Sequence, residues 1–290
     1  MNLAQAMLIR SDCPSCGPGG RIRAFVRRAE SEWVRCQCGL VFLKAVIPAQ
    51  EAARAPAAAA GVVGDHDGYG AYEHRKGRRI AKARHQILDV LNHTAAGPLL
   101  DIGCSLGYTL RAAAQLGLAA TGVEMDGSVV ERDRALGLDV HQGTMTSLPF
   151  SDAQFQVVMM KHVLEHTPDP RTALEEVRRV LKPGGGLFIA VPNLQYHRAM
   201  RHPETHRFFS FSGDGRSDGH YVYYTPAALQ QLLTGLGFRI ARINPHLVHR
   251  RAPPLVRLGQ RAVSPARRVI QEALTRLHLR KEFWLVAVRL

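Results

Sequence analysis

Acidic side chains are scarce in this sequence of 290 residues, where 24 Asp and Glu stand against 38 Lys and Arg, a formal net charge of +14. The positive excess favours an anionic partner, such as RNA, an acidic membrane surface or a phosphorylated substrate; the alternative is a solvated, arginine-rich surface. No run of 18 or more apolar residues occurs, so no membrane-spanning helix is expected. The first residues lack the basic start and apolar core of a signal peptide, so a cytoplasmic protein is expected.

Cysteine is also rare, and five residues are too few for a disulfide scaffold, which indicates a reducing compartment. Four of them form the pattern Cys13-Pro-Ser-Cys16-Gly and Cys36-Gln-Cys38-Gly. We call each of these Cys-containing turns a knuckle, because its tight loop points two thiolates at one place. Two knuckles on facing hairpins direct four thiolates to one point, as in a zinc ribbon. We therefore predict a structural Zn²⁺ with these four ligands, which leave no open position for catalysis. The close Cys-x-Cys spacing leaves a second possibility, a degenerate ribbon with free thiols.

Composition divides the chain into three parts. Residues 1–45 form the cysteine module, which is too small to bury a core alone and would depend on metal to fold. Residues 46–70 are rich in Ala, Pro and Gly and are expected to be a linker. From 71 to 290 helical and strand-like segments alternate, which predicts an α/β domain with a parallel sheet covered by helices on both faces. The predicted strands are 99–102, 120–123, 139–141, 155–160, 187–191, 238–243 and 283–288, and the predicted helices 72–92, 108–116, 127–136, 170–181, 226–236 and 262–277.

The stretch LLDIGCSLG, residues 99–107, indicates a ligand site at the carboxyl ends of the strands. Asp101 ends the first strand, and Gly103 and Gly107 form a turn that lets the backbone approach a ligand closely. An acid before this turn would repel a pyrophosphate but would attract the amino group of a zwitterion. Glu124 ends the second strand, where a carboxylate can accept both hydroxyls of a ribose, and Met125 beside it can pack on adenine. The alternative for Glu124 is a solvated strand end.

Four segments occur together in a familiar order: LLDIGCSLGYTL, ATGVEMD, GTMTSLPFSDAQFQVVMMKHVLEHTPDP and EEVRRVLKPGGGLFIAVPN. In order and spacing they resemble the motifs of class I S-adenosylmethionine-dependent methyltransferases, from about residue 72 to the end of the chain. The resemblance implies S-adenosylmethionine as cofactor. It also implies a Rossmann-like sheet of seven strands whose last strand, here EFWLVAVRL, is antiparallel.

Cofactor contacts are carried over from the same resemblance. The first loop would hold the methionine end and Glu124 the ribose. The family's usual acid after Gly143 is replaced by Thr144, so we expect backbone and packing to hold the adenine. The implied cofactor-binding residues are Asp101, Gly103, Cys104, Ser105, Gly107, Tyr108, Glu124, Met125, Thr144, Met145 and Lys161.

The acceptor is expected beyond the fourth strand. His162 and His166 are candidate general bases, because imidazole titrates near neutrality and methylation of a neutral O–H or N–H removes a proton. Alternatively, His166 only orients its loop. Related quinone-precursor O-methyltransferases carry Glu-x-x-Glu-His in this segment and can bind a divalent ion; because His162 replaces the first acid, we expect no metal there.

A second segment completes the predicted acceptor side. His220, Tyr223 and Tyr224 are expected to line the pocket, with packing at the sheet edge as the alternative for the tyrosines. Residues 200–220 are expected to form a lid or substrate loop. Residues 245–280 would be a basic helical insertion that either packs on the core or docks to RNA, phosphate or a membrane surface.

Three functions fit these features. The leading hypothesis is a methyltransferase acting on a small-molecule or sugar acceptor, because a ribbon ahead of this domain resembles bacterial enzymes of surface-polysaccharide or secondary-metabolite pathways. The first alternative is an RNA base methyltransferase with an N-terminal zinc site, which the charge favours and the sparse aromatic residues of the ribbon do not. The second is a non-catalytic scaffold that binds S-adenosylmethionine and carries a zinc-ribbon binding module.

Overall fold

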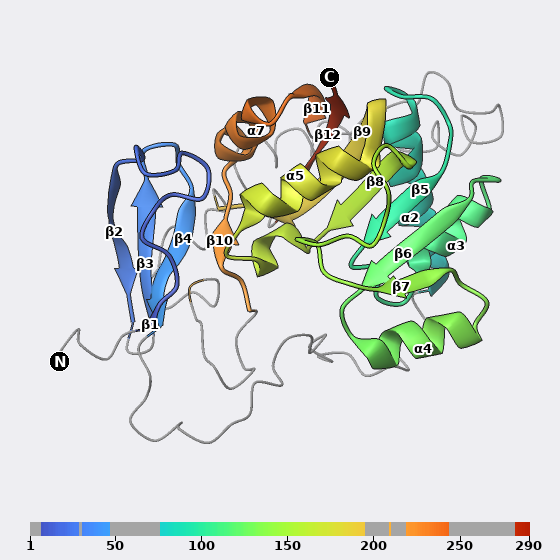
Figure 1. The fold of residues 1–290 in the computed structure, drawn as a ribbon, viewed down its shortest axis with the longest axis horizontal. Helices are drawn as coiled ribbons and strands as arrows, with labels where there is room; N and C mark the ends of the chain where they lie inside the picture. Colours follow the sequence, from blue (N-terminus) through green and yellow to red (C-terminus); the bar gives the residue numbers. More distant parts are fainter. Residues whose placement is uncertain (1–6, 29–30, 47–75, 195–208, 210–218, 244–281) are drawn as a thin grey trace, which may run out of the picture.

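Two β-sheets with helices packed on the larger one make up the computed structural model, which describes residues 7–28, 31–46, 76–194, 209, 219–243 and 282–290 (Figure 1). The predicted insertion at 245–280, the helix predicted at 262–277, and nearly all of the linker at 46–70 and the loop at 200–220 lie outside these residues. Among the described helices, none is long and apolar enough to cross a membrane.

The larger sheet has seven strands in the order β11-β12-β9-β8-β5-β6-β7. Five neighbouring strands run parallel, and β12 is antiparallel to both β9 and β11, as the resemblance implied. The strands are β5 (Leu99–Ile102), β6 (Ala120–Glu124), β7 (Val140–Gln142), β8 (Phe155–Lys161), β9 (Leu181–Pro192), β11 (Phe238–Ile243) and β12 (Glu282–Arg289). The predicted fold class is therefore confirmed.

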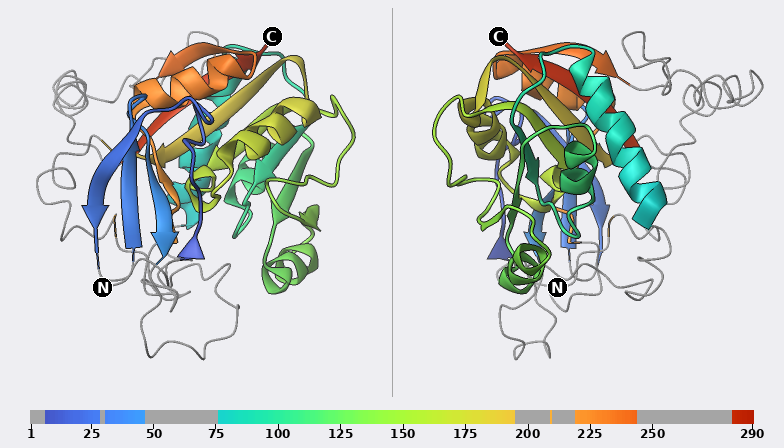
Figure 2. Two further views of the ribbon diagram at one scale, coloured as in Figure 1. Left: turned by 60° about the vertical axis from the view of Figure 1, so that its left-hand side comes forward. Right: turned by 90° about the vertical axis from the view of Figure 1, so that its right-hand side faces the viewer.

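Helices cover both faces of this sheet because successive strand residues point to opposite sides. In β8, Val158 and Met160 face the cluster that α5 and α7 complete, whereas Val157 and Met159 face the cluster of α2 and α3. Figure 2 shows α2 and α5 on opposite sides. The helices are α2 (Lys76–Leu91), α3 (Tyr108–Ala114), α4 (Gly127–Ala135), α5 (Pro170–Val180) and α7 (Pro226–Gly235), with a 3₁₀ turn, η2 (Leu164–His166).

Helices α5 and α7 begin where the sequence carries a capping residue followed by proline. The side chains of Asp169 and Thr225 accept hydrogen bonds from the backbone of the first turn, and Pro170 and Pro226 occupy positions that have no N–H to satisfy. These caps fix the ends of both helices that face the smaller sheet (Figure 1).

The smaller sheet contains β1 (Met7–Leu8), β2 (Ile22–Arg27), β3 (Ser31–Cys36) and β4 (Val41–Val46), in the order β1-β4-β3-β2. These strands and the turns between them are the described part of the predicted cysteine module, and β4 extends it to Val46. Strands β2 and β3 pair antiparallel and connect the first cysteine pair to the second. A further strand, β10 (Val222–Tyr223), comes from the far end of the chain and pairs antiparallel with β4.

The cysteine module shares its hydrophobic core with the larger domain. Trp33 is fully buried, and its ring centroid lies 5.5 Å from Tyr223 and 5.8 Å from Phe209. Phe42 belongs to the same buried cluster as Tyr224. The boundary predicted at residue 45 therefore does not separate two hydrophobic cores.

Candidate functional site

A buried carboxylate lies at the carboxyl end of the central strand. Asp101 is the third residue of β5 and is 1% exposed, with Gly122 of β6 and Met159 of β8 beside it in register. Burial raises the pKa of Asp101, while the Lys161 ammonium and a hydrogen bond from Thr109 oppose that shift. Lys161 in turn donates a hydrogen bond to the Thr109 hydroxyl. Asp101 Oδ1 has no hydrogen-bond partner among the described residues, which is costly unless a ligand supplies a donor.

A second carboxylate, Glu124, ends the neighbouring parallel strand β6. Its Oε2 accepts the Ser105 N–H at 3.0 Å, and its Oε1 accepts the Met125 N–H at 2.9 Å. Oε1 also accepts the Asp126 N–H at 3.4 Å, so of about four acceptor positions on the carboxylate one, on Oε2, remains for a hydroxyl donor. The charge of Glu124 also acts on Asp101, raising its pKa further. The two acids predicted to hold one nucleoside thus lie at the same edge of the sheet.

The turn between β5 and α3 keeps its backbone close to both acids. Gly103 has φ +69°, and a Cβ there would lie 2.4 Å from Val163 Cγ2, so no other residue fits without a shift. Ser105 has φ 48°, an uncommon conformation for a residue with a side chain, and Gly107 caps α3. The side chain of Cys104 is buried in a cluster with Leu110, and its N–H donates to Val123 O.

The remaining predicted cofactor contacts surround this edge. Met125 is 43% exposed, as a residue that covers an adenine would be, and Gln142 Nε2 donates to its carbonyl. Thr144 follows β7 and forms a bridge with Ser147. Met145 is half-buried against the large core cluster, and Tyr108 lies beneath the Arg79 guanidinium, 5.9 Å from its ring centroid.

S-adenosylmethionine fits this residue set. The unpartnered oxygen of Asp101 needs a hydrogen-bond donor, and an α-amino group provides one with opposite charge. Glu124 suits a ribose hydroxyl, and the exposed Met125 provides an apolar surface. We call Asp101, Gly103, Ser105, Glu124 and Lys161 the cofactor half of the site.

Comparisons with known proteins agree with this geometry. Residues 72–243, more than half of the chain, match the methyltransferase-domain family. The chain belongs to the methyltransferase-domain family. Solved structures of S-adenosylmethionine-dependent methyltransferases from Archaeoglobus fulgidus (18% identity, TM-score 0.50, covering 76% of this chain and 100% of that one) and Mesorhizobium loti (16%, 0.51, 71% and 98%) share its fold.

Sequence relatives of this methyltransferase domain include a probable S-adenosylmethionine-dependent methyltransferase of Mycolicibacterium smegmatis, 33% identical over 114 residues (38% of this chain, 44% of that protein). O-methyltransferase resE of Aspergillus sclerotiorum is 32% identical over 164 residues (52% and 58%). The ubiquinone biosynthesis O-methyltransferase of Methylococcus capsulatus is 29% identical over 147 residues (44% and 62%). The chain spans about half the length of these curated relatives.

His162, the first candidate base, lies between two carboxylates. Its Nε2 is 2.9 Å from Glu282 Oε2 and its Nδ1 is 3.3 Å from Glu165 Oε1. Burial alone would lower the pKa of His162, but the bonds to Glu165 and Glu282 outweigh it and raise the pKa to about 9. An imidazolium at neutral pH has no lone pair with which to accept a proton. His162 also has φ 55°, a strained conformation that these ion pairs hold in place.

His166, the second candidate, has a neutral partner instead. Its Nδ1 lies 3.2 Å from the Gly219 carbonyl, which only accepts, so Nδ1 carries a proton and the lone pair of the neutral ring would be on Nε2. Its ring meets that of His220 edge to face at 4.7 Å. Atoms of Glu165, His166 and His220 that can bind a metal lie within 4.8 Å of one another, although the sequence led us to expect none here. Glu165 Oε2 is buried and has no hydrogen-bond partner among the described residues.

The predicted pocket tyrosines are both fully buried. Tyr223 packs in the aromatic cluster around Trp33, and Tyr224 directs its hydroxyl to Leu164 O at 3.4 Å. Burial raises the pKa of Tyr224 well above its ordinary value. The geometry favours the packing alternative for both rings and leaves His220, whose Nδ1 is 3.1 Å from the Tyr223 hydroxyl, as the half-buried member of the predicted pocket.

The four N-terminal cysteines converge. Cys13 Sγ lies 3.7 Å from Cys38 Sγ, Cys36 Sγ lies 3.8 Å from Cys16 Sγ, and all four sulfurs are within 4.8 Å of one another. Tetrahedral Zn–S bonds of about 2.3 Å would place the sulfurs roughly 3.8 Å apart. The Cys-x-Cys spacing therefore permits a tetrahedral set. A Cβ on Gly20 would lie 2.9 Å from Cys13 Cβ, so a residue with a side chain at this position would clash with the first knuckle.

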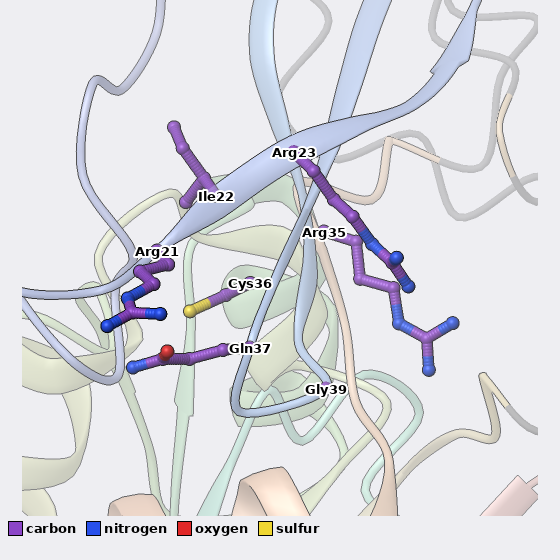
Figure 3. Close-up of a pocket in the computed structure, with 7 residues that line it drawn as sticks. All are labelled: Arg21, Ile22, Arg23, Arg35, Cys36, Gln37 and Gly39. Carbon is purple, nitrogen blue, oxygen red and sulfur yellow. The ribbon is translucent and has the colours of Figure 1, made fainter.

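A basic cavity of about 380 Å³ opens on the outer face of the cysteine module, lined by Arg21, Ile22, Arg23, Arg35, Cys36, Gln37 and Gly39 (Figure 3). Arg23 and Arg35 are directly opposite each other on β2 and β3. Figure 3 shows their side chains extending in the same direction. The cavity belongs to the cysteine module and includes no residue of the cofactor half.

Sequence reasoning missed two contributors. Glu282, in the last strand, pairs with His162 across 120 residues, and no local pattern signals that contact. Thr109 links Lys161 to Asp101, and a threonine one position inside a helix carries no distinctive signal.

Proposed function

We propose that this chain transfers a methyl group from S-adenosylmethionine to a small-molecule acceptor. The observation that carries the proposal is the unpartnered, buried oxygen of Asp101 beside Glu124 at one edge of the sheet. Family membership supports the donor. The relatives' printed names, O-methyltransferase, ubiquinone biosynthesis O-methyltransferase and, for a rice relative, 24-methylenesterol C-methyltransferase, support a small organic acceptor.

When bound, S-adenosylmethionine supplies an electrophilic methyl group on a sulfonium. The protein's part is to align donor and acceptor and to remove a proton from a neutral acceptor. Asp101 and Glu124 hold opposite ends of the donor. His166 takes the proton at Nε2, because Gly219 O fixes its Nδ1 proton. His162 remains charged and serves to hold Glu165 and Glu282 in place.

The test is methyl transfer from methyl-labelled S-adenosylmethionine to three acceptor classes: phenols, hydroxylated sugars and RNA. We expect label in a small molecule. His166→Gln should lower kcat by roughly 100-fold or more, the contribution of a general base, and leave cofactor affinity unchanged. His162→Gln is the matched control and should lower kcat much less than His166→Gln does.

Two results would overturn the proposal. Label in RNA, with a steep salt dependence of binding, would establish the RNA methyltransferase instead. Cofactor binding without transfer to any of the three classes would establish the non-catalytic scaffold.

A further inference from the structure

Strand β10 is held by the cysteine module although it belongs to the other end of the chain. Val222 pairs with Phe42 and Tyr223 with Val41, and the Leu43 N–H donates to Tyr221 O at 2.9 Å. Tyr223 then enters the aromatic cluster of Trp33 and Phe209. A strand of two residues has few bonds of its own, so its position depends on the edge that receives it.

Both cysteine knuckles contact the elements that flank the candidate base. In the first knuckle, the carbonyl of Ser15 accepts a hydrogen bond from Arg171 Nη2 of α5 at 2.8 Å. Arg10, just before this knuckle, donates to Pro168 O at 2.9 Å. In the second knuckle, a Cβ on Gly39 would lie 3.0 Å from the Oγ1 of Thr225, the cap of α7.

Residues 219–224 in turn hold η2 and its histidine. The Tyr221 N–H donates to Glu165 O at 2.7 Å, Tyr224 reaches Leu164 O, and Gly219 O accepts from His166. We call His162, η2 and residues 219–224 the acceptor half. The cofactor half makes none of these hydrogen bonds: its own run between β5, β6, β8 and α3, and it meets η2 where Gly103 lies against Val163.

We propose that the metal-loaded cysteine module is a positioning element for the acceptor half. When Cys13, Cys16, Cys36 and Cys38 bind Zn²⁺, the two knuckles hold β4 in position, and β4 holds β10 by strand pairing. The segment that contains β10 then holds His166 and His220 in position beside the acceptor. Loss of the metal loosens β10 and leaves Asp101 and Glu124 as they are. The catalytic part of this inference rests on the proposed function; the mechanical part does not.

The mechanical part is tested by hydrogen exchange on the full chain. Chelation of the wild type should accelerate exchange in the peptides that contain residues 219–224 and 164–166, leave 99–107 unchanged, and be reversed by added Zn²⁺. In a Trp284→Phe background, Trp33 is the one tryptophan left and its emission should shift to the red. Equal acceleration in 99–107, or none at 219–224, would overturn the proposal.

The catalytic part uses Cys38→Ser with Gln37→Ala as the matched control, since Gln37 lies between two ligands and is exposed. Cys38→Ser should reduce bound zinc from about one per chain, lower kcat/KM for the acceptor about tenfold or more, and change the cofactor dissociation constant by less than about twofold. Arg171→Ala, which keeps all four ligands, should lower kcat/KM for the acceptor without loss of zinc or of cofactor affinity. Parallel losses of cofactor and acceptor binding would overturn the proposal.

The two failures are distinguishable. If no acceptor is methylated while exchange at 219–224 still follows zinc content, the proposed function fails and the positioning stands. If methylation proceeds unchanged in the zinc-free protein, the proposed function stands and the positioning fails.

Discussion

The two halves of the site are built in different ways. The cofactor half comes from adjoining parallel strands and one turn, so most of its residues fall between positions 101 and 124, with Lys161 from the next strand. The acceptor half joins residues near 165 and 220, and residues near 15, 39 and 171 hold the elements beside it, so it depends on both sheets. A parallel sheet fixes a cofactor site by itself, whereas this acceptor site depends on contacts between distant parts of the chain.

The two halves also differ in how their charged side chains are paired. In the cofactor half, one oxygen of a buried acid lacks a partner among the described residues. In the acceptor half, His162 lies between Glu165 and Glu282, and Glu282 also pairs with Lys82 at 3.1 Å. Glu165 Oε2 also lacks a hydrogen-bond partner among the described residues, but its other oxygen is paired with His162, whereas Asp101 is left with room for a cationic ligand. Substitutions should therefore affect ligand affinity in one half and stability or geometry in the other.

The largest expected effect is on the cofactor half. Asp101→Asn keeps the shape of the side chain and removes its charge, so cofactor affinity should fall by roughly 10- to 100-fold, the loss of a charge-assisted bond of about 1.5–3 kcal/mol. Calorimetric titration measures this change. Asp152→Asn, at an exposed acid paired with Arg179, is the control. An unchanged dissociation constant for Asp101→Asn would remove the assigned role.

Gly103→Ala should disturb both halves, because Gly103 packs on Val163, which leads into η2. The added Cβ would lie 2.4 Å from Val163 Cγ2 at a φ of +69°, at a cost of about 1–3 kcal/mol in the free energy of unfolding. Denaturant unfolding measures the loss. Adding Val163→Ala should relieve the clash but not the backbone strain, so full rescue, or no rescue, would contradict this account.

The pH dependence of stability tests the acceptor half. Because the pKa of His162 is raised from 6.5 to about 9, its stabilisation is complete below pH 6.5 and is lost as the pH rises through 9. With His162 partly exposed, solvent screening limits the effect to about 1 kcal/mol. Unfolding at pH 6 and pH 9.5 measures it. Glu282→Gln should reduce the loss of stability between pH 6 and pH 9.5 and lower the pKa of His162 measured by NMR. If the stability of the variant falls as steeply with pH, another group causes the dependence.

The smallest effect concerns the cavity in Figure 3. Arg23 and Arg35 are like charges directly opposite each other, which is destabilising. Arg23→Glu should stabilise the protein by about 0.2–1 kcal/mol, and Arg21→Glu, outside the ladder, should gain less. Thermal unfolding compares the two variants. A loss of stability for Arg23→Glu would mean that Arg23 serves to balance a negative charge, such as that of four metal-bound thiolates.

Sequence reasoning succeeded where the signal is local. The order of strands and helices follows from hydrophobic periodicity, the positions of Asp101 and Glu124 from the ends of two predicted strands, and the antiparallel last strand from the family resemblance. It did less well where distant segments meet. Tyr223 and Tyr224 carried equal signals for a pocket and for packing, and burial against Trp33 and Leu164 decided for packing. The pairing of β10 with β4 has no local signature, since two residues show no periodicity.

The most direct test is titration of S-adenosylmethionine into the wild type and into a double variant, Asp101→Asn with Glu124→Gln. The account predicts one saturable site per chain in the wild type, and no saturation at millimolar concentration in the double variant. A wild type that fails to saturate, or a double variant that binds like the wild type, would contradict the assignment of these two carboxylates to a single nucleoside.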